Sequence, residues 1–292
     1  MRPPPDQLAA LVAIADHGTF EAAARHLHVS PSAVSQRIRA LESAAGQVVV
    51  RRGTPCRPTA AGETLLRLAR QTELLYDEAR AALGDDAAGR TTLALAVNAD
   101  TLATWFRDVV AEVAGWEGVA LRLVVEDQAY SGRLLRSGDC LAAVTGDPVP
   151  VQGCSSERLG VLRYRPAASP AFAERWSTGR GHDWARMPMV VFNEQDALQH
   201  DVLRDRGVDR PPVVHRVPTS ADFHEAVRLG LGWGVLPEPQ LLPDVEAGRV
   251  VTLGGRTHVD VDLHWQRWRI DSPLLMRLTD AVRRAARGGL RR

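Results

Sequence analysis

Apolar positions between residues 20 and 41 recur with helical spacing and are interrupted once, which predicts two short helices joined by a tight turn. The apolar stripes are Ala23, Ala24 and Leu27 in the first helix and Val34, Ile38 and Leu41 in the second. Ser30 followed by Pro31 favours a helix start, because serine caps the free N–H groups and proline fits the first helical position. This pattern is typical of a helix-turn-helix.

The outer face of the second helix carries hydrogen-bonding side chains rather than acids. These are Ser32, Ser35, Gln36 and Arg39, with Arg37 at the edge. After a break at Gly46, an apolar run and a Pro-rich return predict a wing that carries Arg51, Arg52 and Arg57. Basic residues outnumber acids by six between Arg25 and Arg70, whereas the whole chain has a net charge of +1. We expect this module to bind double-stranded DNA; any small helical hairpin with a polar outer face is the alternative.

Several segments carry a family resemblance. The run AAARHLHVSPSAVSQRIRALE, then Gly46 and RPTAAG at 57–62, resembles the N-terminal domain of LysR-type transcriptional regulators. The segments 93–106, 124–128 and 142–154 resemble the LysG/ArgP-like branch, which controls export of basic amino acids. We therefore expect a winged helix-turn-helix domain at 1–58, a linker and dimerisation helix with hinge at 59–90, and an effector-binding domain at 91–292.

The stretch from Thr59 to Leu83 predicts one long helix with an apolar seam. The seam residues are Leu65, Leu68, Thr72, Leu75, Ala79 and Ala82. Pairing with the same helix of a second subunit would bury this seam, and the resemblance also implies a homodimer or homotetramer. Packing back on its own domain is the alternative. Residues 84–90, GDDAAGR, predict a solvated hinge.

Beyond the hinge, apolar or β-branched runs alternate with helical stretches, which predicts an α/β domain with largely parallel sheets. The expected strands are 92–97, 119–125, 140–145, 161–169, 189–192, 212–217, 233–237, 249–253 and 261–268. The resemblance implies two Rossmann-like lobes in the manner of periplasmic binding proteins. We expect the first lobe at about 91–163 and 268–292, and the second at about 164–267.

In such folds a ligand binds beyond the carboxyl ends of the strands. The segments there are rich in carboxylates and hydroxyls and lack arginine, which predicts a cationic ligand such as lysine or arginine. The expected effector-binding residues are Asn98, Asp100, Thr101, Glu126, Asp127, Thr145, Asn193, Thr219, Ser220 and Asp222; Ala99, Gln128, Ser131 and Asp196 follow the same strands. Asp100 and Asp127 come first, because both lie in the resembling segments. Helix capping is the alternative role for Asp100, Ser220 and Asp222.

Composition excludes several kinds of site. All 36 basic residues are arginines, so neither Schiff-base chemistry nor a Walker-type phosphate loop is available. Three widely spaced cysteines support neither a disulfide framework nor a zinc site, and the histidines lack metal-ligand spacing. We find neither GxSxG nor HExxH, so we expect no enzyme and no cofactor besides a small-molecule effector. Without a membrane-length apolar run or a signal-peptide core, we expect a cytoplasmic protein away from membranes.

The sequence thus predicts a sequence-specific DNA-binding regulator that responds to lysine, arginine or a related basic amino acid and controls an amino acid exporter gene. Its expected partners are double-stranded DNA and further copies of itself, and RNA polymerase is considered as well. Three alternatives remain open. They are a LysR-type regulator for another small metabolite, a nucleoid-binding protein with low selectivity, and an enzyme acting on an amino acid with the helix-turn-helix appended.

Overall fold

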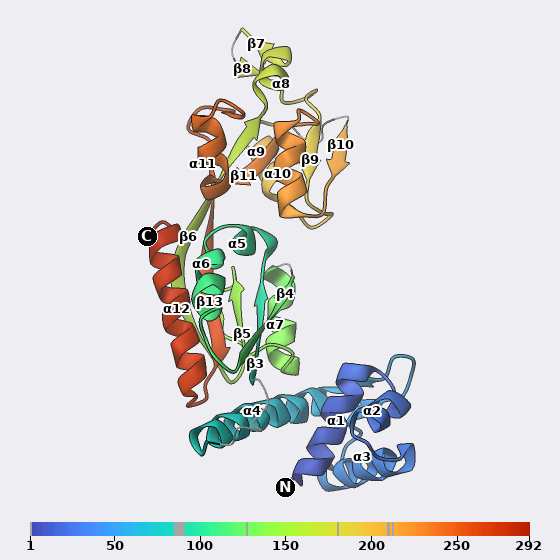
Figure 1. Cartoon of the computed structure of the whole chain (residues 1–292). Helices are drawn as coiled ribbons and strands as arrows, with labels where there is room; N and C mark the ends of the chain where they lie inside the picture. The colour runs from blue at the N-terminus through green and yellow to red at the C-terminus, as the bar shows by residue number, and fades with distance from the viewer. Residues whose placement is uncertain (1, 85–90, 127, 180, 209–210, 212) are drawn as a thin grey trace.

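The chain is arranged in three tiers in the computed structural model, which describes all residues except 1, 85–90, 127, 180, 209–210 and 212 (Figure 1). The lowest tier in this view holds the N-terminal helices and the long helix α4. The two tiers above it are α/β lobes joined by long strands. None of the helices in this described part is both long and apolar enough to cross a membrane.

The first tier contains the expected helix-turn-helix. Its helices are α1 (Pro5–His17), α2 (Phe20–His26) and α3 (Pro31–Ala45). Ser30 caps α3, since its Oγ accepts a hydrogen bond from the backbone N of Ala33 at 3.2 Å, and Gly46 ends the helix with φ of 66°. The predictions for α2 and α3 are confirmed. Helix α1 was not predicted, because its apolar residues are too closely spaced to form a one-sided stripe, yet Leu11 and Ile14 are buried in the core of this tier.

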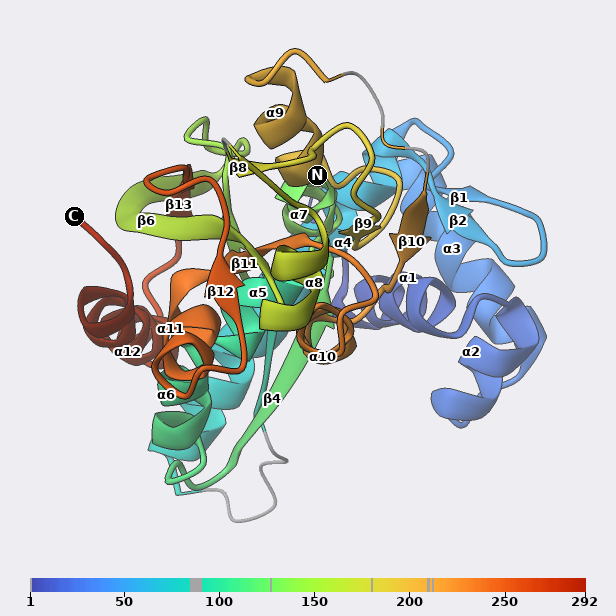
Figure 2. The same ribbon diagram turned by 90° about the horizontal axis from the view of Figure 1, so that it is seen from above.

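The predicted wing is a pair of short antiparallel strands, β1 (Val50–Arg51) and β2 (Arg57–Pro58), which Figure 2 shows beside α3. Helix α4 (Ala60–Ala82) leaves the wing, with Thr59 as its N-cap. Gly62 allows this close approach, because a Cβ there would stand 2.0 Å from the carbonyl oxygen of Val49. The wing and α4 are therefore packed as one unit.

Helix α4 buries more of its surface against its own chain than the sequence suggested. Leu65 and Leu74 are buried, the first in the core of the N-terminal tier and the second in that of the lobes. Leu68 and Leu75 are each 42% exposed, and Tyr76 is 58% exposed. The alternative of packing on its own domain therefore describes one side of α4, and an apolar stripe remains open on another side.

Two long strands, β6 (Cys154–Ala168) and β13 (Val259–Trp268), connect the lobes. The first lobe contains β3 (Thr91–Val97), α5 (Ala99–Ala103), α6 (Phe106–Val113), β4 (Val119–Val125), α7 (Gln128–Ser137), β5 (Ala142–Thr145) and α12 (Pro273–Gly289). The second contains α8 (Pro170–Arg175), β7 (Ser177–Thr178), β8 (Gly181–His182), β9 (Met189–Val191), α9 (Leu198–Arg204), β10 (Val214–Arg216), α10 (Ser220–Arg228), β11 (Gly234–Pro237), α11 (Glu238–Glu246) and β12 (Val251–Thr252). The sequence-predicted strands are thus found; several are shorter than expected, and β3, β6 and β13 are longer.

The main sheet has the strand order β11-β6-β13-β5-β3-β4, with β12 paired to β6. Among the strand pairs of the described residues, β3 with β4, β3 with β5, and β9 with β10 are parallel and the other six are antiparallel, so the expectation of largely parallel sheets is wrong. The cause is the pair β6 and β13, which run out to the second lobe and back and must therefore be antiparallel. Residues 264–267 of β13 pair with β5, which places these four residues in the sheet of the first lobe.

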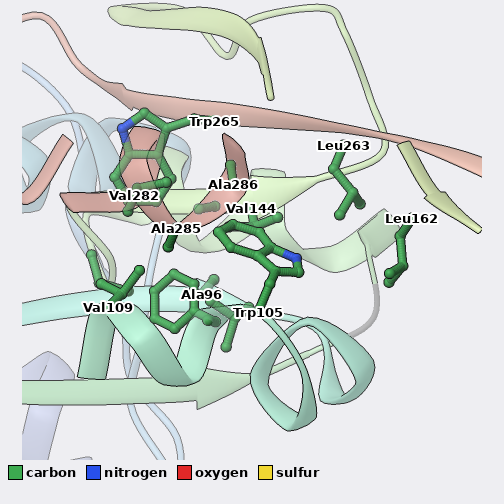
Figure 3. Packing of buried hydrophobic residues seen from close by; sticks show 14 of the residues in the cluster. Ala96, Trp105, Val109, Val144, Leu162, Leu263, Trp265, Val282, Ala285 and Ala286 are labelled. Atoms are coloured by element: carbon green, nitrogen blue, oxygen red, sulfur yellow. The ribbon is translucent and has the colours of Figure 1, made fainter. Parts of the chain in front are cut away.

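The core of the first lobe sets the position of the strand ends. Figure 3 shows Trp105 and Trp265 packed among small side chains such as Ala96 and Ala285. Both indoles are buried, and Trp265 Nε1 donates a hydrogen bond to Thr279 Oγ1 at 3.2 Å. Because β3 is completely buried from Leu93 to Val97, the residues that follow it are held in a fixed place.

Candidate DNA-binding surface and effector site

The polar face of α3 is open to solvent as the sequence predicted. Ser32, Gln36 and Arg39 are exposed, and Ser35 is half-buried. Arg37 lies at the edge and its Nε forms an ion pair with Asp6 Oδ2 at 3.2 Å, so this arginine also contacts α1. Direct base contact by these five residues stays a prediction.

The wing places its arginines beside α3. Arg51, Arg52 and Arg57 are all exposed, and the Arg52 guanidinium lies 5.0 Å from the centre of the Phe20 ring. Glu42 ties the end of α3 to the wing, because its Oε1 accepts a hydrogen bond from the backbone N of Val49 at 3.0 Å. These positions suit contacts with phosphates, which also stay predictions.

A cavity of about 330 Å³ lies between the two lobes. Its lining comes from the segment after β3, from β6 and β13, and from the second lobe. The lining residues are Asn98, Ala99, Asp100, Tyr164, Phe192, Asn193, Gln195, Asp196, Ala197, Leu198, Phe223, Val235, Leu236, Pro237, Gln240 and Val261. Among these described residues the carboxyl groups are those of Asp100 and Asp196, and none of the residues is an arginine. The cavity is therefore suited to a small cationic ligand.

Asp100, in the first lobe, forms a hydrogen bond to the second lobe. Ser220 Oγ, at the start of α10, donates a hydrogen bond to Asp100 Oδ1 at 2.8 Å, and the hydroxyl of Tyr164 bonds to the same carboxylate. Gln240 Nε2 in turn lies 3.5 Å from Ser220 Oγ. Burial raises the pKa of Asp100, the two hydroxyl donors act against this, and the charge of Asp196 adds to it. A bound cation would favour the ionised form of this carboxylate.

Asp196 is the second carboxylate of the cavity. Its Oδ2 accepts a hydrogen bond from the backbone N of Phe192 at 2.8 Å, and its Oδ1 accepts one from that of Leu198 at 3.2 Å. Burial raises the pKa of Asp196 above its ordinary value, although these hydrogen bonds act in the opposite direction. Because both oxygens are held by the backbone, the charge has a fixed position in the cavity.

Asn98 offers a donor to the same cavity. Its Oδ1 caps α5 by accepting a hydrogen bond from the backbone N of Thr101 at 2.6 Å. Its Nδ2 is buried without a partner in the described part of the chain, as are Thr101 Oγ1 and Gln240 Oε1. Buried donors without partners are uncommon, which makes Asn98 a candidate ligand contact.

Only some of the predicted effector residues line the cavity: Asn98, Asp100 and Asn193 do. Thr219 is the N-cap of α10 and bonds to the exposed Asp222, so the capping alternative describes Asp222, whereas the N-cap of α5 is Asn98 and not Asp100. Ser220 is not part of the lining, but it contacts two lining residues, Asp100 and Gln240. Thr101 is buried behind Asn98, Thr145 is buried at the end of β5, and the backbone N of Glu126 bonds to Val97. Asp127 lies outside the described residues.

Several lining residues were not anticipated. Tyr164 lies within the run 161–169 that predicted a strand, where it stands between Arg163 and Arg165 and nothing in the sequence marked it as a cavity residue. Nothing in the neighbouring sequence predicted that the cavity would be lined by Phe192, Gln195 and Gln240. Asp196, noted with its strand but not selected, is part of the lining.

Two of the three cysteines are held as thiols. All three are free and buried. Burial raises the thiol pKa of Cys140 to about 12 and that of Cys154 to about 11, which leaves both largely protonated at neutral pH. Redox sensing by these two thiols is therefore not supported.

Comparison with known proteins identifies both parts of the chain. Residues 5–63 match the model for the bacterial regulatory helix-turn-helix protein of the lysR family, and residues 86–287 match the LysR substrate binding domain. The lysine export transcriptional regulatory protein LysG of Corynebacterium efficiens is 49% identical over 98% of this chain and 99% of its own length. Full-length LysG of Corynebacterium glutamicum with bound effector Arg superposes with a TM-score of 0.85, at 44% identity over 99% of this chain and 100% of that one. ArgP from Mycobacterium tuberculosis gives 0.89, at 45% identity over 100% and 99%.

Proposed function

Because this chain belongs to the LysR family of bacterial helix-turn-helix regulators, we propose that it controls transcription in response to a basic amino acid, lysine or arginine, bound between its two lobes. The observation that carries the proposal is the pair Asp100 and Asp196 in a cavity whose described lining has no basic side chain. Two relatives support it, one named for lysine export and one with bound arginine. An amino acid exporter gene is the proposed target, and the cytoplasm is the proposed place of action.

The cavity has the size and chemistry for one such ligand. Its volume of about 330 Å³ is at the lower end of ordinary ligand sites. The positive groups of the amino acid would lie near Asp100 and Asp196, where burial strengthens charge-assisted hydrogen bonds. The α-carboxylate would accept a hydrogen bond from Asn98 Nδ2, which has no partner in the described structure. Asp127 is kept as a proposed additional contact.

The regulator would act as a homodimer held by the open stripe of α4. Leu68 and Leu75 are large apolar residues left partly exposed, and the same stripe of a second copy would cover them. We also propose that the protein can form a tetramer and that it contacts RNA polymerase. The α3 face and the wing arginines would then be presented twice, once to each half of an operator.

Titration calorimetry of the purified protein against the twenty amino acids tests the effector. We expect heat of binding with lysine or arginine and little with neutral amino acids of similar length. Asp196→Asn should weaken the basic ligand strongly, whereas Asp222→Asn, on the exposed cap of α10, should bind as the parent does. Asp127→Asn tests the remaining predicted contact in the same assay.

The outcomes separate the alternatives. If the parent binds neither lysine nor arginine, the basic-amino-acid proposal is wrong and another metabolite must be sought. If the protein binds random DNA as tightly as any promoter fragment upstream of an exporter gene, a nucleoid-binding role gains support. Recovery of the amino acid in altered form would point to an enzyme.

A further inference from the structure

The guanidinium of Arg70, midway along α4, makes hydrogen bonds in two directions. Its Nη1 donates to the carbonyl oxygen of Gly138 at 2.9 Å and to Asp139 Oδ1 at 2.6 Å, both in the first lobe. Its Nη2 donates to Asp16 Oδ1 at the end of α1. The side chain is 11% exposed. We propose that Arg70 is the positioning residue that fastens α4 and its helix-turn-helix to the effector-binding lobe and so couples effector binding to DNA binding.

The turn that receives Arg70 is shaped for close contact with α4. Gly138 has φ of 79°, and a Cβ there would stand 2.8 Å from the Cα of Arg67. Asp139 is held in place, because Ser137 Oγ donates to its Oδ2 at 2.6 Å and Arg122 Nη2 donates to its carbonyl oxygen at 2.7 Å. Arg67 adds a hydrogen bond from its Nη1 to the carbonyl oxygen of Gln152 at 3.1 Å. The turn is therefore a rigid docking point.

This turn lies at the end of the first lobe opposite the cavity and is joined to it by two elements. Helix α7 starts after β4, on the cavity side, and ends at Ser137 beside α4 (Figure 1). Strand β5 returns in the other direction and pairs with β3, which leads into Asn98 and Asp100. A shift of the cavity wall would reach α4 through packed elements that do not deform easily.

A second attachment lets α4 pivot. Glu78 Oε1, two turns after Arg70, accepts hydrogen bonds from Ser272 Oγ at 2.6 Å and from the backbone N of Leu274 at 2.9 Å. This carboxylate therefore ties α4 to the start of α12. If the Arg70 contacts are lost, α4 remains attached to the lobe at Glu78 and through Arg67, and the angle of α4 and of the DNA-binding helices can change about these remaining contacts.

The junction around Arg70 also has room to move. A hollow of about 560 Å³ is lined by residues of α1, α4 and the first lobe. Its charged residues are Asp16, Glu73, Asp77 and Asp139 against Arg70 and Arg122. Without Arg70, four carboxylates would face one arginine, and their repulsion would favour opening of the junction.

The test uses the full-length protein and compares three variants. Arg70→Ala removes every contact of the guanidinium, and Asp139→Asn removes one charge. Asp262→Asn is the matched control, because its exposed ion pair with Arg158 joins β13 to β6 and involves no residue of α4. Two quantities are measured: the affinity for arginine or lysine by calorimetry, and the fold-change in operator affinity when that amino acid is added.

This test rests on the proposed function, so the parent protein serves as the reference. We expect the effector to change the parent's operator affinity by about 5- to 150-fold, the usual range of allosteric coupling. Arg70→Ala and Asp139→Asn should bind the amino acid as the parent does while this ratio falls towards one. If both keep the parental ratio, the inference is wrong.

Hydrogen exchange without effector decides the inference even if the proposed ligand fails. Exchange of backbone amides at the end of α1 and in residues 138–141 should rise in Arg70→Ala and remain parental in Asp262→Asn. Parental exchange in Arg70→Ala would overturn the inference. A parent that binds neither amino acid would contradict the proposed function alone.

Discussion

The predicted DNA-binding face lies within residues 32–57 and projects outward, whereas the effector cavity collects its lining from segments between residues 98 and 261 and lies between two lobes. The first surface is exposed, so its charges are screened by solvent. In the second, burial raises the pKa of both Asp100 and Asp196. One surface can therefore rely on many weak contacts, while the other depends on a few strong ones.

Helix α4 joins the two surfaces, and its open stripe gives the largest expected effect. Leu75→Arg would place a charge in the proposed dimer seam, and burying it without a partner costs on the order of several kcal/mol. We expect a monomer in sedimentation velocity. Leu83→Arg is the control, because Leu83 is 86% exposed at the end of the helix. A Leu75→Arg protein that is dimeric and as stable as the parent would place the dimer surface elsewhere.

The buried charge of Asp100 gives the next effect. Asp100→Asn keeps the acceptor for Ser220 and removes the charge, so affinity for lysine or arginine should fall by about 10- to 150-fold, as expected for a lost charged hydrogen bond. The raised pKa means that the ionised form of Asp100 is less favourable in the folded protein than in the unfolded chain. The melting temperature should therefore stay level or rise. Parental affinity in this variant would contradict the assignment of Asp100.

Substitutions of predicted base-contacting and phosphate-contacting residues on the outward surface should have different effects on DNA binding. Gln36→Ala removes a predicted base contact and should reduce discrimination between operator and random DNA by about 1 to 3 kcal/mol. Arg57→Ala removes a predicted phosphate contact, so it should weaken all sequences alike and lower the salt slope by about one. Binding titrations across salt measure both. Equal loss of selectivity in the two variants would refute the division.

The smallest effect concerns pH. Because binding of a cation requires ionised Asp100 and Asp196, and burial raises both pKa values above those of exposed aspartates, effector affinity should decline as the pH is lowered below neutral towards these raised values. Calorimetry in buffers of different ionisation enthalpy should also detect proton release on binding. In Asp100→Asn the pH dependence should be weaker. An affinity that is constant over this range in the parent would contradict a role for these pKa shifts.

Sequence reasoning was accurate where a structure is formed by neighbouring residues. The period of Val34, Ile38 and Leu41 and the Ser30–Pro31 start are local properties, and α3 begins at Pro31 as predicted. The relative direction of paired strands could not be predicted from neighbouring residues. The sequence of β6 is compatible with a parallel or an antiparallel neighbour. The pairing is antiparallel because β13 runs back from the second lobe alongside β6.

The candidate site divides in the same way. Asn98 and Asp100 could be identified because they directly follow a buried strand, and the sequence determined that carboxylates gather at such ends. Thr219 and Asp222 follow the same rule but form a helix cap, since that hydrogen bond needs only residues three apart. Tyr164 and Gln240 reach the cavity from other elements, and Arg70 meets Asp139 across 69 residues. Local periodicity, helix capping and charge are encoded by residues that are close in the sequence, so the sequence by itself determined them. Which distant side chains share a cavity depends on how whole helices and strands pack, so only the tertiary structure decided it.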